Sequence, residues 1–471
     1  MPTYAANVPL TFYGGLAGAL APFACFFAGV AALALNGAPD EKGFWPILLA
    51  ALTLGLLLAR DRARYAEAML DGMSQRVVMV MLCAWLFAGV LGAVLGASGF
   101  VGALASLANA AHLTGGAYVG AAFLVCVVVS TATGTSFGTI LICGPLLYPA
   151  GGPANAAPAA LMGAILAGAT LGDSMSPVSD TTIASSGTQH VDIGGTVRSR
   201  LAYAIPAGLA ALVASTLLGG NGSPRATDSQ QFAPGAVHAA PLLLLASPAL
   251  VIGLLLAKRH LIEALLLGIA SAVGLGLLLG LITPFDLLHI DATAFGATGI
   301  IVDGMQRAVG VSVFTLLLVA LVGTLQATDA VDRLVLAAQG KASSVRGAES
   351  WIVGVVSVAV LLTTHSVVAI LAVGEFARQT GERFGVSGYR RANLLDMTVC
   401  TWPFLLPYFL PTILAASASK SGAAFGMPAV SAASIGLHNT YAWALAVAVV
   451  FAVVTGYGRG REVDADGVSN R

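Results

Sequence analysis

The chain has 471 residues, of which 57% are hydrophobic and only 9% are charged, and its formal net charge is zero. A soluble domain carries about 25% charged residues, so this composition cannot cover a water-facing surface. It also excludes a single-pass receptor or an anchored soluble enzyme, because no polar stretch is long enough to form a separate domain.

Apolar stretches recur along the chain from Leu10 to Val454. Since a transmembrane helix needs about 20 apolar residues, we predict an all-α polytopic membrane protein. The predicted spans are 10–35, 43–59, 76–97, 157–189, 201–219, 239–257, 261–283, 307–326, 391–418 and 437–456. Two further stretches, 117–150 and 350–377, have a polar break in the middle, and each is predicted to be a re-entrant hairpin.

The basic residues favour ten spanning helices plus two hairpins. With this topology most Lys and Arg residues fall on the side that holds both termini, as the positive-inside rule requires. We expect a multi-pass protein of the bacterial inner membrane with both termini in the cytoplasm. The first nine residues contain no positive charge, which argues against a removable signal peptide. The five cysteines lie in apolar runs and are interpreted as small packing residues.

The two halves of the chain are related by three pairs of markers, whose members are 223 to 232 residues apart. The pairs are Asp71-Gly-Met-Ser-Gln-Arg76 with Asp303-Gly-Met-Gln-Arg307, Thr133-Gly-Thr-Ser136 with Thr363-Thr-His-Ser366, and Asp173 with Asp396. An odd number of predicted crossings separates the copies, so the second copy is inverted, as in many secondary transporters. The predicted parts are N-terminal helices (1–70), a first repeat (71–219), a loop with connecting helices (220–302), a second repeat (303–456) and a cytoplasmic tail (457–471).

Polar breaks inside the membrane are the candidate functional sites, because non-helical backbone is tolerated there only in a cavity or inside protein. The first break, 131–139, offers the hydroxyls of Thr135, Ser136 and Thr139. Two glycines permit a tight reversal at this point, where two half-helices present free carbonyls and free amides. The alternative interpretation is a tight turn whose hydroxyls satisfy the local backbone.

The second break, 172–186, is unwound by Pro177 and carries two carboxylates, Asp173 and Asp180. Its oxygen donors suit hard cations. A carboxylate at the bilayer centre costs about 2.5–3.5 kcal/mol, so it indicates function by default. The alternative is that both aspartates cap helix ends.

The second half has fewer polar groups. His365 and Ser366 occupy the tip of the second hairpin, and Asp396 and Thr401 precede a proline-rich segment. Asp396 is predicted to lie shallow unless a cavity reaches it. No Lys or Arg is placed inside a span near these acids, so we expect an anionic site that attracts a cation or a proton.

The candidate residues therefore form two groups. The candidate sodium ligands are Asp180, Asp173, Thr181 and Ser179. The candidate pathway residues are Thr135, Ser136, Thr139, Ser176, His365, Ser366, Asp396 and Thr401.

The second break resembles a known signature. Gly172-Asp-Ser-Met-Ser-Pro-Val-Ser-Asp-Thr-Thr182 is similar to G-D-K-M-S-P-L-S-D-T-T-N of the NhaC family of sodium/proton antiporters, and Gly134-Thr-Ser-Phe-Gly-Thr139 resembles that family's G-T-S-W-G-T. Asp396, Thr401 and Pro403 resemble its second-half D…T…P element. The resemblance implies an ion-transporter fold and exchange of sodium for protons. Two residues depart from the signature: Ser174 replaces its lysine and Ile183 its final asparagine.

These observations favour a secondary transporter rather than an enzyme. The expected partners are sodium, protons and the lipid bilayer, without a cofactor or a nucleic acid, and a homodimer is left open. The runner-up is a sodium- or proton-coupled carrier of a small organic carboxylate or amino acid. An aspartyl or serine intramembrane protease and a passive channel are further alternatives, which the incomplete protease motifs and the paired breaks disfavour.

Overall fold

The computed structural model describes residues 9–35, 41–220, 240–257, 259–291 and 296–459. Within these ranges the chain is helical, apart from two short antiparallel strands, β1 (His289–Asp291) and β2 (Gly296–Thr298). Eight of the described helices are long and apolar enough to cross a membrane, or ten if each of two bent pairs is one span. The predicted polytopic helical fold is confirmed.

The first half of the chain contributes ten α-helices and one 3-10 turn. They are α1 (Leu16–Leu35), η1 (Glu41–Gly43), α2 (Phe44–Leu58), α3 (Arg62–Met73), α4 (Arg76–Ala97), α5 (Phe100–Ala110), α6 (Gly116–Thr133), α7 (Ser136–Ala150), α8 (Pro158–Met175), α9 (Asp180–Thr188) and α10 (Ile193–Gly219). The predicted break in 117–150 separates α6 from α7, and the break in 157–189 separates α8 from α9.

The second half contributes the remaining helices. They are η2 (Ala240–Leu245), α11 (Ala246–Leu256), α12 (Leu261–Leu278), α13 (Pro284–Leu287), α14 (Ile300–Gln326), α15 (Ala330–Ala338), α16 (Val345–Thr363), α17 (Ser366–Arg383), α18 (Gly388–Val399), α19 (Trp402–Leu405), α20 (Leu410–Ser419), η3 (Lys420–Phe425), α21 (Ala432–His438) and α22 (Thr440–Thr455). The helices from α18 to η3 bend by 42° where Pro407 interrupts the backbone bonding. The beginning of the predicted part 220–302, residues 221–239, and most of the predicted tail 457–471 lie outside the described residues.

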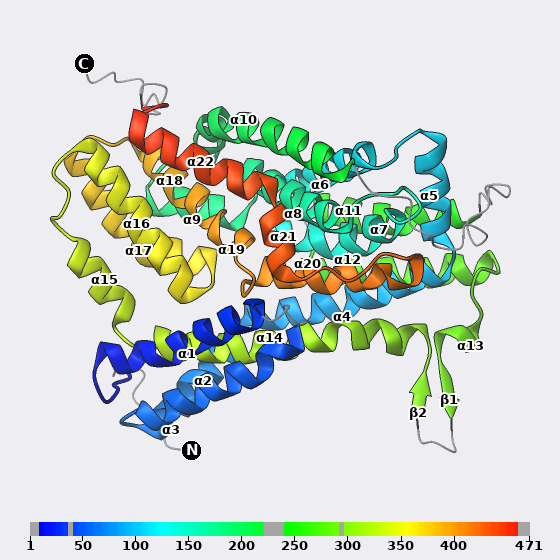
Figure 1. The fold of residues 1–471 in the computed structure, drawn as a ribbon, viewed down its shortest axis with the longest axis horizontal. Helices are drawn as coiled ribbons and strands as arrows, with labels where there is room; N and C mark the ends of the chain where they lie inside the picture. The colour runs from blue at the N-terminus through cyan, green and yellow to red at the C-terminus, as the bar shows by residue number, and fades with distance from the viewer. Residues whose placement is uncertain (1–8, 36–40, 221–239, 258, 292–295, 460–471) are drawn as a thin grey trace.

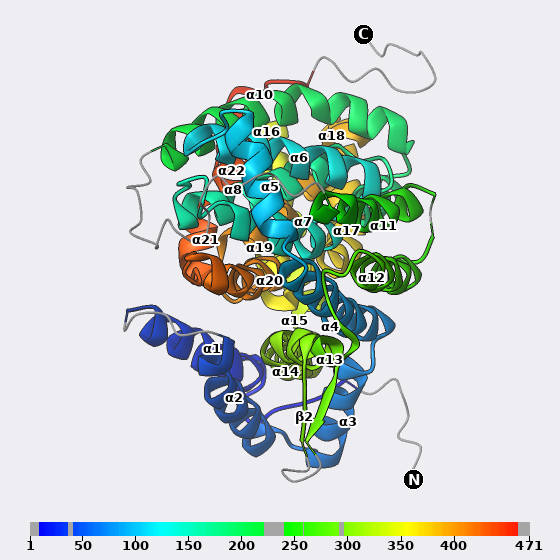
Figure 2. The same ribbon diagram turned by 90° about the vertical axis from the view of Figure 1, so that its right-hand side faces the viewer.

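The helices form two layers. Helices α1, α2, α3 and α14 make the lower layer in Figure 1, and a larger bundle lies above them. Helix α4 lies between the layers, where it contacts α14 on one side and α7 and α12 on the other (Figure 2). Helix α3 and the end of α22 lie at the same end of the molecule, on the left in Figure 1. The sidedness of that end remains a prediction.

Helices α3 and α4 cross α14 at two reciprocal close approaches. A Cβ on Gly72 would lie 2.3 Å from the Val319 carbonyl oxygen and 3.0 Å from the Gly323 Cα, and a Cβ on Gly304 would lie 2.9 Å from the Gly89 carbonyl oxygen. Gly72 and Gly304 are equivalent residues of the repeated Asp-Gly-Met marker. Each marker glycine therefore packs against a long helix of the other copy, Gly72 against α14 and Gly304 against α4, as expected of the predicted inverted repeat.

The two broken hairpins enter from opposite ends of the bundle. Helices α16 and α17 occupy the left of Figure 1, and α6 and α7 occupy its centre and right. The arms contact each other within both hairpins. The breaks at 134–135 and 364–365 line the same cavity, which brings the two hairpin tips together, as expected of the predicted inverted repeat.

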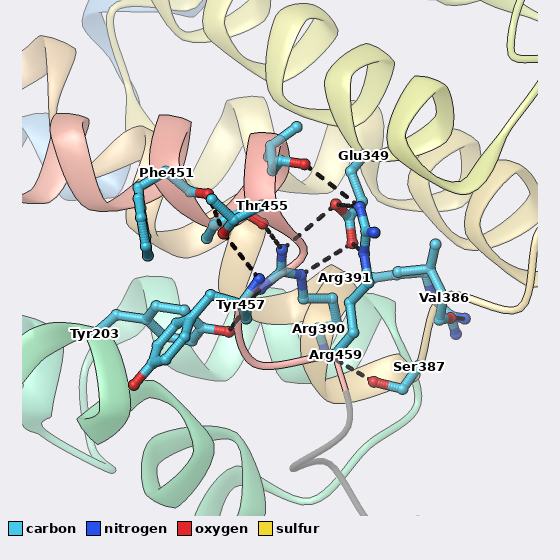
Figure 3. Close-up of polar contacts among 12 residues, drawn as sticks. Tyr203, Glu349, Val386, Ser387, Arg390, Arg391, Phe451, Thr455, Tyr457 and Arg459 are labelled. Atoms are coloured by element: carbon cyan, nitrogen blue, oxygen red, sulfur yellow. Dashed lines mark hydrogen bonds and ion pairs between the residues drawn. The ribbon is translucent and has the colours of Figure 1, made fainter.

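A buried ion cluster fixes the outer end of the second hairpin (Figure 3). Glu349 on α16 is fully buried and pairs with Arg390 on α18 at 3.1 Å and with Arg459 beyond α22 at 2.6 Å. Arg390 also donates to the Tyr203 hydroxyl on α10, at 2.6 Å. The cluster joins α10, α16, α18 and the segment after α22 at one point.

Candidate functional site

The two hairpin tips have the same backbone geometry. Gly134 ends α6 in the left-handed conformation, with φ +68°, and Thr135 is extended before α7. At the second tip Thr364 ends α16 with φ +52°, and His365 is extended before α17. The predicted relation between the two Thr-rich markers is therefore confirmed in the backbone.

A second break separates α8 from α9 and carries the signature residues. Helix α8 ends at Met175, because Pro177 has no amide proton to continue the bonding pattern. Helix α9 begins at Asp180, so this carboxylate occupies the first turn, where the helix dipole favours negative charge. The break passes directly beside the first hairpin tip, because a Cβ on Gly134 would lie 2.6 Å from the Val178 Cγ2 atom.

The hairpin tips and the α8–α9 break share one cavity of about 300 Å³. The two tips contribute Gly134, Thr135, Ser136, Phe137, Thr364, His365, Ser366 and Val367 to its lining. The α8–α9 break contributes Asp173, Ser179, Asp180 and Thr181. The cavity thus joins both halves, and it is large compared with the roughly 30 Å³ that a water molecule occupies.

Asp173 is the most enclosed acid of this cavity, with 8% of its surface exposed. The Ser136 hydroxyl donates to its Oδ2 atom at 2.9 Å, whereas Oδ1 is buried without a hydrogen-bond partner. Asp180 is exposed within the cavity lining. A buried carboxylate oxygen that lacks a donor needs a proton or a cation to offset its lost hydration.

The remaining cavity-lining candidates offer hydroxyl and imidazole groups. Ser179 and Thr181 hydrogen-bond each other through their hydroxyls at 3.1 Å. The Ser366 hydroxyl donates to the Val399 carbonyl at 3.2 Å, which ties the second tip to the end of α18. The Nδ1 atom of His365 is buried without a hydrogen-bond partner.

Four predicted pathway residues do not line the cavity, and three of them satisfy local backbone. Thr139 and Thr401 donate to carbonyls four and three residues earlier in the chain. The Ser176 hydroxyl accepts a bond from the Val178 amide. These contacts match the alternative interpretation, in which break hydroxyls satisfy the local chain.

The fourth, Asp396, is fully buried behind the cavity and pairs with Arg200 at 2.6 Å. The prediction that no Lys or Arg lies near the acids is therefore wrong. Asp396 also accepts bonds from Thr182 at 3.1 Å and Ser185 at 3.3 Å. Arg390 and Arg391 on the same helix, α18, are buried as well, and the depth of Asp396 in the membrane remains a prediction.

Sequence reasoning missed Arg200, which the predicted span 201–219 excluded by a single residue. Asp192 caps α10, so the helix begins at Ile193 and Arg200 lies two turns inside it. The sequence Asp-Ile-Gly-Gly is a recognisable helix start and could have moved this boundary. Cys400 was also missed as a cavity residue, since it was interpreted only as packing.

The donor set suits a hard cation better than a transition metal. Among the described residues, no group of three or more His, Cys, Asp or Glu side chains could hold a metal ion. Carboxylate, hydroxyl and carbonyl oxygens remain, and these are the ligands that hard cations prefer. The two cavity acids can also take up protons, so one site can bind either species.

Comparison with known proteins also indicates an ion transporter. The model of the Na+/H+ antiporter family matches residues 15–219. The Na(+)/H(+) antiporter NhaC of Bacillus subtilis (strain 168) is 35% identical over 182 residues, which cover 37% of this chain and 39% of that protein. The malate-2H(+)/Na(+)-lactate antiporter of the same organism is 36% identical over 99 residues, 21% of each chain.

A solved structure, the YdaH transporter of Alcanivorax borkumensis, covers 86% of this chain and 91% of its own, with a TM-score of 0.38 and 14% identity. The match to the first of the curated relatives spans about two fifths of that protein's length. The matched family is one of transporters rather than enzymes, so the protease alternative is wrong. In its signature break and over residues 15–219, the chain is similar to the Na+/H+ antiporter family.

Proposed function

We propose that the protein exchanges sodium ions for protons across the bacterial inner membrane by alternating access. The observation that carries the proposal is Asp173, which lines a cavity shared by both halves and whose buried Oδ1 atom has no hydrogen-bond donor. A dehydrated sodium ion or a proton would each satisfy it. Because the two species compete for one carboxylate, loading one releases the other.

In this mechanism Asp173 is the central acid and Asp180 the second. Ser136 holds one Asp173 oxygen at 2.9 Å, which leaves the other oxygen oriented for the cation. Burial disfavours the charged carboxylate, so protons compete with sodium when sodium is scarce. Movement of the hairpin tips against the scaffold then exposes the loaded site to each side in turn.

The test is sodium-driven proton movement in proteoliposomes that contain a pH-sensitive dye. We expect Asp173→Asn and Asp180→Asn to abolish it, because an amide can neither take up a proton nor neutralise a cation. Thr139→Val is the matched control, since its hydroxyl bonds only its own helix and it does not line the cavity. Normal exchange by both aspartate variants would remove these acids from the mechanism.

A second candidate is sodium- or proton-coupled transport of a small organic carboxylate. It is favoured by the cavity volume of about 300 Å³ and by His365, whose unpartnered Nδ1 could donate to a carboxylate. One matched relative is named as a malate and lactate antiporter. Sodium flux that requires an added organic acid, and that His365→Ala weakens, would favour this candidate over simple ion exchange.

A further inference from the structure

Arg200 contacts both sides of the signature break and both halves of the chain. Its Nη1 atom donates to the Ser174 carbonyl at 2.9 Å and to the Thr182 hydroxyl at 2.8 Å. Its Nη2 atom pairs with Asp396 at 2.6 Å, and its Nε atom donates to Asn393 at 3.1 Å. The guanidinium is 1% exposed, and its Nη2 atom has the Asp396 ion pair but no hydrogen bond.

We infer that Arg200 is a positioning residue for transport: a built-in cation that neutralises Asp396 and holds the two ends of the α8–α9 break behind the cavity. The role of Arg200 in ion binding rests on the proposed function. The pairing of Arg200 with Asp396 is independent of that proposal.

The first step concerns the backbone of the break. Carbonyls in the last turn of a helix lack an intrahelical donor and carry partial negative charge. Ser174 lies in the last turn of α8 and Thr182 in the first turn of α9, so one planar guanidinium spans the gap between them. Asp173 and Asp180 lie beside these two contacts, and their positions therefore depend on Arg200.

The second step concerns charge. Asp396 is equivalent to Asp173 by repeat position, but its charge is already balanced by Arg200 and it does not line the cavity. Net negative charge at the cavity then comes from Asp173 and Asp180. If Asp396 lost its charge, Arg200 would become an unbalanced cation directly behind the sodium site. Breaking one partner of a buried ion pair is costly, whereas removing both is tolerated far better.

The first experiment tests the pairing without transport. The thermal unfolding midpoint is measured in detergent for Asp396→Asn, Arg200→Gln, the double variant and Arg200→Lys. We expect each single neutral variant to lower the midpoint more than the double variant does. Midpoint losses that simply add in the double variant would overturn the inference.

The second experiment measures KM and maximal rate for sodium in proteoliposomes. We expect Asp396→Asn to raise KM by roughly tenfold, the order expected for one uncompensated charge inside a protein. The double variant should return to within about twofold of the wild-type KM, while its maximal rate stays low because the break has lost its guanidinium contacts. Arg200→Lys keeps the positive charge but not the planar guanidinium that bonds both ends of the break. Its KM should therefore stay near wild type while its maximal rate falls.

Two outcomes of the second experiment contradict the inference. A double variant as impaired in KM as Asp396→Asn would make Asp396 itself a sodium ligand. An unchanged KM in Asp396→Asn would limit Arg200 to holding the fold. Absence of sodium-driven proton movement in the wild-type protein would instead contradict the proposed function, and the unfolding comparison would still decide the pairing.

Discussion

At the tip of α6–α7, Gly134 turns left-handed and Thr135 extends, and at the tip of α16–α17, Thr364 and His365 adopt the same two conformations. The residues that carry this shared geometry differ. Glycine adopts a positive φ without cost, whereas a β-branched threonine is strained there. The first tip therefore combines a relaxed turn with close backbone packing, and the second retains backbone strain beside the cavity.

The acidic side chains of the two halves also differ in their surroundings. Asp173 and Asp180 in the first half line the cavity, and one Asp173 oxygen has no partner. Asp396 and Glu349 in the second half are fully buried and paired with arginines. The equivalent acids Asp173 and Asp396 thus have different surroundings. In the proposed mechanism the first offers negative charge to a cation, whereas the second is paired with Arg200.

The largest expected effect is on the stability of the second half. We expect Glu349→Gln to lower the free energy of unfolding by about 3–5 kcal/mol, because Arg390 would lose its buried counter-charge and Arg459 would lose its partner. Asp180→Asn, the matched first-half variant, should keep wild-type stability, since Asp180 is exposed in the cavity. Thermal unfolding in detergent measures both. Equal losses in the two variants would contradict the division of roles between the halves.

The next comparison substitutes the residue with a positive φ at each hairpin tip. We expect Gly134→Ala to destabilise by about 2–5 kcal/mol, from the positive φ and from a Cβ 2.9 Å from the Val178 carbonyl. Thr364→Gly relieves strain but adds freedom to the unfolded chain, so stability should stay within about 1 kcal/mol of wild type. Thermal unfolding and proteoliposome rates are measured together. A Thr364→Gly variant as unstable as Gly134→Ala would show that the tips are not equivalent.

The sequence was sufficient to place the breaks, because glycine, proline and clustered hydroxyls have local effects on backbone that need no tertiary information. Both hairpin tips and the α8–α9 break lie where these residues predict them. The sodium-site candidates at the α8–α9 break also line the cavity. Their role in transport remains a prediction.

The ion-pair partner of each buried acid could not be predicted, because it depends on packing between segments that are distant in the sequence. Arg200 and Asp396 are 196 positions apart, and only the fold brings α10 against α18. Glu349 and Arg459 are 110 positions apart and also meet only in the fold. Asp173 and Asp396 look alike in sequence, and the difference in their surroundings appears only when the helices are packed together.

The smallest expected effect concerns a contact between the halves at the edge of the bundle. The Tyr389 hydroxyl on α18 donates to Asp192, which also caps α10 through the Gly195 amide. These bonds hold the pKa of Asp192 below its ordinary value of 3.8. A lowered folded-state pKa stabilises the protein above pH 3.8 and is lost as the pH falls through the folded value. Because Asp192 is exposed, Tyr389→Phe should cost less than about 1 kcal/mol at pH 7.

The difference between Tyr389→Phe and wild type should shrink as Asp192 becomes protonated below pH 3.8. Thermal unfolding midpoints recorded between pH 7 and pH 3 measure it, with Asp192→Asn as a control that cannot titrate at this position. If the deficit of Tyr389→Phe were the same at both ends of this range, it would come from lost packing of the tyrosine hydroxyl. The contact between Tyr389 and Asp192 would then owe nothing to the Asp192 charge.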